Sequence, residues 1–216
     1  MGAIARSAAN NITTSGVFTS GAIANSSVTG ITVLANASDG ITLISSQTAS
    51  ASASISFTTG IDSTYKAYKF VFVNIHPATN DTGLQFNLST DGGSNYNVTK
   101  TTTNFRAIHL EDDSTTALAY RADEDLAQGT GFQFLFAGNG NGNDEAGSGS
   151  ITLFNPSSTT YVKHFIATSN NYYELDGSFN WFVAGYGNTT SAVNAIQFKM
   201  NSGNIDAGTI YLYGIK

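Results

Sequence analysis

Apolar and polar residues alternate over short stretches along most of this chain, and the strongest of these stretches spans residues 65–76. Successive side chains of a strand point to opposite faces of a sheet. One face of this strand would hold three aromatic residues, Tyr68, Phe70 and Phe72. The other would hold three aliphatic residues, Val71, Val73 and Ile75. A strand that is apolar on both faces is typical of the inside of a sheet, so we expect the fold to pack around it.

The segments that follow predict antiparallel pairing. The first strand is expected to end at His76-Pro77, because proline lacks the N–H that the next pair of ladder hydrogen bonds requires. Residues 84–89 then alternate between apolar and polar, which predicts a strand with one buried and one solvated face. Gly92 and Gly93 come next and can adopt the positive φ of a tight hairpin.

The rest of the chain repeats this pattern as about ten short strands separated by turns. No segment shows a helical period for longer than a turn or two. We therefore predict an all-β fold, an antiparallel β-sandwich of jelly-roll type, with a barrel as the lesser alternative. The sandwich is expected to span residues 46–216.

Residues 1–45 differ from this domain because they are small and polar, with single apolar residues spaced by Ser, Thr and Gly. Such a segment cannot form a core of its own. It is either a disordered arm or an extended N-terminal arm for attachment and oligomerisation, which buries its apolar residues against other chains. The second alternative is favoured, and the contacts would be made by Val17, Phe18, Ile23, Val28, Ile31, Val33 and Leu34.

Composition narrows the classes of partner. Only 11% of the residues are charged, the net charge is −6, and the few Lys and Arg residues are scattered, so nucleic acid is not expected as a partner. No apolar run approaches the roughly 20 residues of a membrane-spanning helix, so membrane insertion is not expected either. The chain has no cysteine, which suits a reducing cytoplasm, and its start lacks the pattern of a signal peptide.

No motif predicts an enzyme, a metal site or a cofactor. The glycine-rich loop at 138–147 precedes a predicted strand, whereas a dinucleotide-binding loop must open a helix. The acidic groups at 111–113 and 123–125 lack the spacing of a calcium loop and are expected to be solvated. The chain also has three histidines without recognisable partners, to which we assign structural roles: His76, His109 and His164.

Three tyrosines are candidates for contact with sugar rings, since neighbouring asparagine amides could bond sugar hydroxyls: Tyr172, Tyr173 and Tyr186. The alternative is that these aromatic side chains belong to the core.

Several segments resemble virion structural proteins of tailed bacteriophages. Residues 19–29 (TSGAIANSSVT) are similar to repeats in the anchoring and shaft segments of tail fibres. Residues 57–62 (FTTGID), 88–96 (LSTDGGSNY) and 208–216 (GTIYLYGIK) resemble small β-rich virion proteins. The resemblance implies a non-enzymatic virion protein, assembled in the host cytoplasm, usually as a homotrimer, whose arm attaches to other virion proteins.

Because the chain has almost no shaft, the resemblance leaves open a tail fibre, a short spike or a capsid decoration protein. A tail fibre or tail-associated protein that contacts a host surface glycan is the first hypothesis, and a decoration (cement) protein is the second. A free carbohydrate-binding β-sandwich protein is the third.

Overall fold

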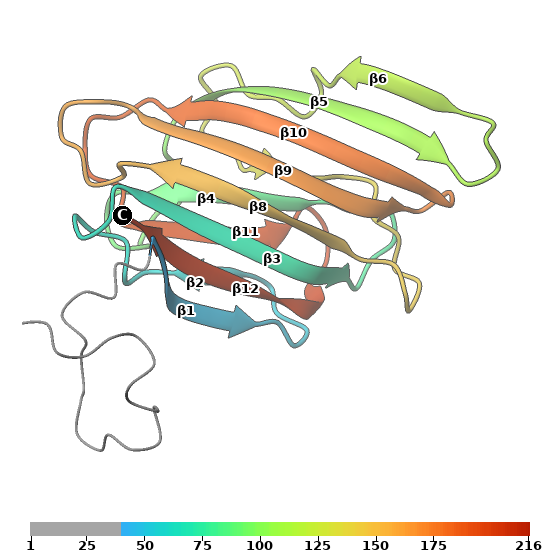
Figure 1. Cartoon of the computed structure of the whole chain (residues 1–216), viewed down its shortest axis with the longest axis horizontal. Coiled ribbons are helices and arrows are strands. Elements are labelled where there is room, and N and C mark those ends of the chain that lie inside the picture. The colour runs from blue at the N-terminus through green and yellow to red at the C-terminus, as the bar shows by residue number, and fades with distance from the viewer. Residues whose placement is uncertain (1–39) are drawn as a thin grey trace, which may run out of the picture. The chain divides into compact units, whose positions relative to one another are not determined.

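The computed structural model describes residues 40–216, which form two antiparallel sheets and contain no helix. The large sheet has eight strands in the order β1 (Ile41–Thr48), β12 (Ile205–Ile215), β3 (Ala67–Pro77), β8 (Gly147–Phe154), β9 (Lys163–Tyr173), β10 (Gly177–Gly187), β5 (Lys100–Leu110) and β6 (Thr116–Tyr120). The small sheet has four, β2 (Ile55–Phe57), β11 (Ala195–Met200), β4 (Leu84–Ser89) and β7 (Gln133–Phe134). Figure 1 shows the small sheet behind the large one. The predicted β-sandwich is confirmed, and a barrel is excluded because β1 and β6 are free edges of the large sheet.

The core lies between the sheets and is rich in aromatic rings. Phe70 of β3 contacts Phe198 of β11, with 5.6 Å between ring centroids, and Phe86 of β4 meets Phe165 of β9 edge-on at 5.0 Å. Trp181 of β10 is fully buried. Burying an aromatic side chain removes a large apolar area from water, so these contacts hold the two sheets together.

The strand predicted to organise the fold is β3, which has β12 and β8 as neighbours. The alternation in its sequence fails at one place: Ile75, predicted to share a face with Val71 and Val73, is fully buried in the core with Phe72. A β-bulge between Phe72 and Ile75 causes this change of side. Its residue Asn74 has a φ of 52°, which is in the left-handed region.

The prediction of a solvated face on β4 is wrong. Of its three polar residues on that side, Asn87 and Ser89 are buried and Gln85 is half-buried. Loop segments cover Asn87, whose side-chain amide donates to the carbonyl oxygens of Tyr96 at 2.6 Å and Thr130 at 2.9 Å. Buried amides are tolerated when their hydrogen bonds are made in this way.

The predicted boundary between arm and sandwich falls inside β1. Residues 41–45, assigned to the arm from the sequence, pair with β12 at the edge of the large sheet. The seven apolar residues expected to mediate attachment and oligomerisation lie between positions 17 and 34, outside the described residues.

The two faces of the large sheet have different surroundings. The small sheet packs against the inner face, which carries Phe70 and Trp181. No described element packs against the opposite face, which we call the outer face; it looks toward the viewer in Figure 1. Several large apolar side chains of the outer face are exposed, including those of Phe105, Leu118 and Ile166.

Candidate functional site

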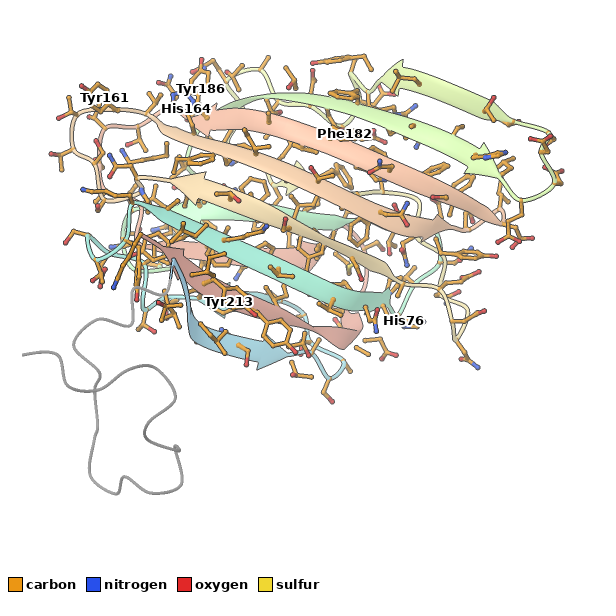
Figure 2. All side chains as sticks on the ribbon, viewed as in Figure 1. His76, Tyr161, His164, Phe182, Tyr186 and Tyr213 are labelled. Atoms are coloured by element: carbon orange, nitrogen blue, oxygen red, sulfur yellow. The ribbon has the colours of Figure 1, made fainter. Side chains whose placement is uncertain are left out.

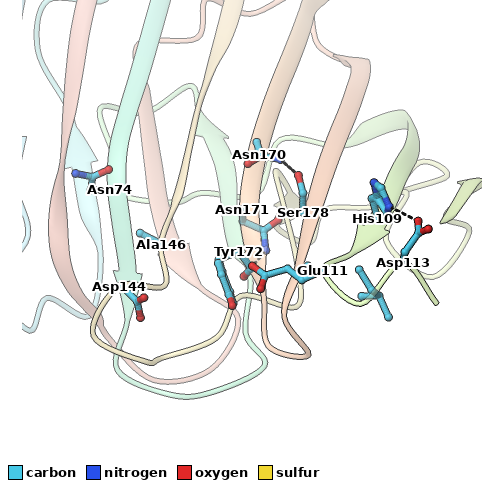
Figure 3. A pocket seen from close by; sticks show the side chains of 12 residues that line it. Asn74, His109, Glu111, Asp113, Asp144, Ala146, Asn170, Asn171, Tyr172 and Ser178 are labelled. Carbon is cyan, nitrogen blue, oxygen red and sulfur yellow. Dashed lines mark hydrogen bonds and ion pairs between the residues drawn. The ribbon is translucent and has the colours of Figure 1, made fainter. Parts of the chain in front are cut away.

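A hollow of about 620 Å³ lies at one end of the large sheet and is called the end hollow (Figure 3). Strands β9, β10 and β5 contribute Tyr172, Ser178 and His109 to its wall, and Glu111 lies just after the end of β5. The side opposite these residues is formed by Asn74, Asp144 and Ala146.

Strand register brings the hollow's side chains together. Tyr172 of β9 pairs with Ser178 of β10, which pairs in turn with His109 of β5. Directly opposed residues of neighbouring strands share a face of the sheet, so all three side chains belong to the outer face. The bulge at Asn74 places a polar residue at the other wall.

The ring of Tyr172 is held in place by its hydroxyl, which donates to Asp176 Oδ1 at 3.0 Å. This hydrogen bond is the main cause that raises the pKa of Tyr172 to about 12, and the nearby Glu111 carboxylate acts in the same direction. The phenol therefore stays neutral at physiological pH. The hollow offers a fixed aromatic ring together with carboxylate, amide and hydroxyl groups.

Ser178, His109 and Asp113 share this hollow, but they do not form a nucleophile with its base. His109 Nε2 lies 3.0 Å from Asp113 Oδ1. Ser178 Oγ accepts instead from the Asn170 side-chain amide at 2.8 Å, and none of the hydrogen bonds among residues 40–216 joins it to His109. A serine nucleophile requires a base within hydrogen-bond reach, and Ser178 has no such bond to His109.

The described residues include no group of three or more His, Cys, Asp or Glu side chains arranged to hold a metal ion. The acidic turn after β5 satisfies part of its own hydrogen bonding, since Asp112 Oδ1 accepts from the Ser114 backbone amide at 2.9 Å.

The three histidines lie in different surroundings. His76 Nε2 lies 3.0 Å from the Gly142 carbonyl oxygen, and His164 meets the Tyr186 ring at 6.0 Å between centroids.

A second concave region runs along the outer face over β9, β10 and β5. It consists of hollows of about 480 and 200 Å³ that share Thr103, Ile166 and Ala184. Phe105 and Phe182 stack at its floor, with 5.0 Å between ring centroids and 11° between ring planes. Figure 2 shows Phe182 near the middle of the sheet and Tyr186 beside His164 near one end.

The three tyrosines predicted as sugar contacts do not form one platform. Tyr172 lines the end hollow, and Tyr186 lines the larger outer-face hollow. Tyr186 is eight positions along β10 from Ser178, the partner of Tyr172, which corresponds to about 26 Å of strand. Tyr173 is half-buried and stacks on Phe179, with 3.9 Å between ring centroids.

Two lysines are buried, Lys100 and Lys163, and the sequence did not predict their burial. Lys100 Nζ donates to Asn87 Oδ1 at 2.5 Å and to the Val98 carbonyl oxygen at 2.8 Å, and burial lowers its pKa to about 7. Lys163 Nζ donates to the Tyr161 carbonyl oxygen at 2.6 Å, and burial lowers its pKa as well. The alternation of β9 could have predicted that Lys163 is buried, because Lys163 is in phase with the buried residues of that strand.

No family model, curated protein or solved structure matches the chain. Among residues 40–216 there is also no helix that is long and apolar enough to cross a membrane. The chemistry of the two concave regions and the exposure of the outer face are therefore the observations on which a function can be argued.

Proposed function

We propose that this protein is a non-enzymatic structural component of a tailed-bacteriophage virion, a tail fibre or tail-associated protein that forms a homotrimer. Its N-terminal arm would anchor it to other virion proteins. The observation that most supports this proposal is the outer face, on which apolar side chains from several strands are exposed together. Monomeric soluble proteins rarely expose an extended apolar surface, and a subunit of an assembly has neighbours to cover it.

The same face argues for a structural role over a free binding protein. A small glycan would cover only part of a sheet whose exposed apolar side chains range from Leu43 on β1 to Leu118 on β6. A protein neighbour can cover the whole width. A capsid decoration protein would need the same property, so the position in the particle must be measured.

Contact with a host surface glycan is the second part of the proposal, and we assign it to the end hollow. A fixed ring at Tyr172 can stack on a sugar, while Asn170, Glu111 and Ser178 offer partners for hydroxyl groups. Tyr186 and Tyr173 are not needed for this contact, because one lies far along the sheet and the other packs against the core.

Antibody labelling of purified particles tests the structural role. We expect label at the tail, and no label after residues 1–40 are deleted from the phage gene, although the shortened protein is still made. Label on the head instead would favour the decoration protein. Particles that never carry the label would contradict the proposal as a whole.

A glycan array probed with the full chain tests the end hollow. We expect Tyr172→Ala to lower glycan binding at least tenfold, because it removes the ring that would stack on the sugar. Tyr161→Ala is the matched control, since Tyr161 is 69% exposed in a turn away from the hollow. Equal binding by the two variants would remove the end hollow from the proposal but leave the virion role intact.

A further inference from the structure

We infer that the outer face of the large sheet is the surface through which copies of this chain contact one another. This inference rests on the homo-oligomer of the proposed function and specifies which surface joins the subunits. The apolar side chains of this face on β8, β9, β10, β5 and β6 are called the outer patch: Phe105, Leu118, Tyr120, Phe154, Ile166 and Phe182.

Exposed apolar side chains are concentrated on this face. Ten large apolar residues are exposed in the described part of the chain, and two of them, Tyr161 and Leu175, lie in turns. The other eight point outward from the large sheet: Ile41, Leu43, Val73, Phe105, Leu118, Tyr120, Phe154 and Ile166. Burying such side chains is favourable by roughly 25 cal/mol per Å² of apolar surface.

Charge is almost missing from the same surface. None of the outward residues of β8, β9, β10, β5 and β6 is Asp, Glu, Lys or Arg. The chain as a whole carries a net charge of −6, so two copies would repel each other through most other surfaces. On β3 the outward residues include one charged side chain, Lys69. The five strands from β8 to β6 therefore form an uncharged part of the face, where identical acidic subunits can approach and where nothing attracts a partner of opposite charge.

The dimensions of the face suit a subunit contact. Its eight strands hold 76 residues. At about 3.3 Å per residue and about 4.8 Å between strands, they cover roughly 1,200 Å². A stable protein interface needs roughly 800 Å² per partner, so the face is large enough to supply a subunit contact.

Strand β6 extends this surface beyond the sandwich. All five of its residues are exposed, which means that neither of its faces is packed within the described chain. Its sequence, Thr-Ala-Leu-Ala-Tyr, has no charged residue or proline that would protect a free edge strand. An edge of this kind is tolerated when a neighbouring subunit covers it.

Sedimentation of the full chain over a concentration series tests the inference. Ile166→Lys and Leu118→Lys each place a charge in the proposed contact, and we expect each to weaken self-association by at least roughly 100-fold. Leu175→Lys is the matched control, because Leu175 is 58% exposed, close to the 56% of Ile166, and lies in a turn. It should associate like the unchanged chain. At high dilution, where every variant is monomeric, circular dichroism should give equal melting temperatures for all of them.

Hydroxyl-radical footprinting gives an independent readout on the unchanged protein. Side chains of the outer patch should become protected as the concentration rises, whereas Tyr161 and Leu175 should stay reactive. Protection of the turns instead, or a chain that stays monomeric at all concentrations, would overturn the inference. So would oligomers that persist in both lysine variants, which would indicate contacts through residues 1–39. In that last case particle labelling would still support the virion role, so the two failures are distinguishable.

Discussion

Both faces of the large sheet carry aromatic side chains, but only the inner face is covered within the described chain. Phe179, Trp181 and Val183 of β10 point inward and are buried, whereas Phe182, between them in the sequence, points outward and stacks on Phe105. Only the inner face has a second sheet against it. Aromatic residues on a strand therefore predict that a face will be covered, but they do not say whether the same chain supplies the cover. Inner residues should determine stability, and outer residues should determine assembly.

Removing an inner aromatic ring should give the largest effect. Trp181→Ala is expected to lower the free energy of unfolding by about 3 to 5 kcal/mol, because it leaves a cavity between the sheets. It also removes the indole N–H that donates to Asn171 Oδ1 at 2.8 Å. Urea unfolding measures the change. Trp181→Phe should cost clearly less because it retains a ring, and an equal loss in both variants would contradict this account.

Disturbing the bulge that sends Ile75 inward should have the next largest effect. Gly208 of β12 has a φ of 114°, and a Cβ added there would lie 2.5 Å from the Asn74 carbonyl oxygen. We expect Gly208→Ala to cost about 1 to 3 kcal/mol of stability. Gly40→Ala is the control, since a Cβ there meets nothing within 4 Å. Similar thermal denaturation of the two variants would show that the bulge tolerates a side chain.

The buried amine of Lys100 should make stability depend on pH. Because burial lowers its pKa from 10.5 to about 7, the unfolded chain binds more protons than the folded chain between these values. The free energy of unfolding should therefore rise with pH in that range, by at most about 1.4 kcal/mol per pH unit. Denaturation at pH 7, 8 and 9 should show a steeper rise for the unchanged chain than for Lys100→Met. Parallel curves would contradict the shift.

An outer residue should give the smallest effect on the isolated subunit. Leu118 is 72% exposed, so Leu118→Ser should change the free energy of unfolding by less than about 0.5 kcal/mol when measured at high dilution. At high concentration the same variant should associate less than the unchanged chain. A large loss of stability at high dilution would show that the outer patch is part of the monomer's own core.

Much of this fold was predictable from the sequence, because alternation at residues 84–89 and in β3 identifies both strands and their apolar core sides. The burial of the polar side of β4 was not predictable, since loop segments distant in the sequence cover Asn87. The inward position of Ile75 was not predictable, since one bulge residue reverses the alternation. The end hollow could be predicted only in parts. Tyr172 was a candidate, but its neighbours His109, in β5, and Glu111, just after it, are far away in the sequence, and strand register cannot be obtained from periodicity.

Strand β6 also has a consequence for motion. It is bonded to the sheet on one side only, through β5, and its five side chains are all exposed. Local opening costs least where few contacts are lost, so the amide hydrogens of Thr116–Tyr120 should exchange with solvent earlier than those of the inner strands. If a neighbouring subunit covers this edge, their exchange will slow as particles form, and β6 will report on the progress of assembly.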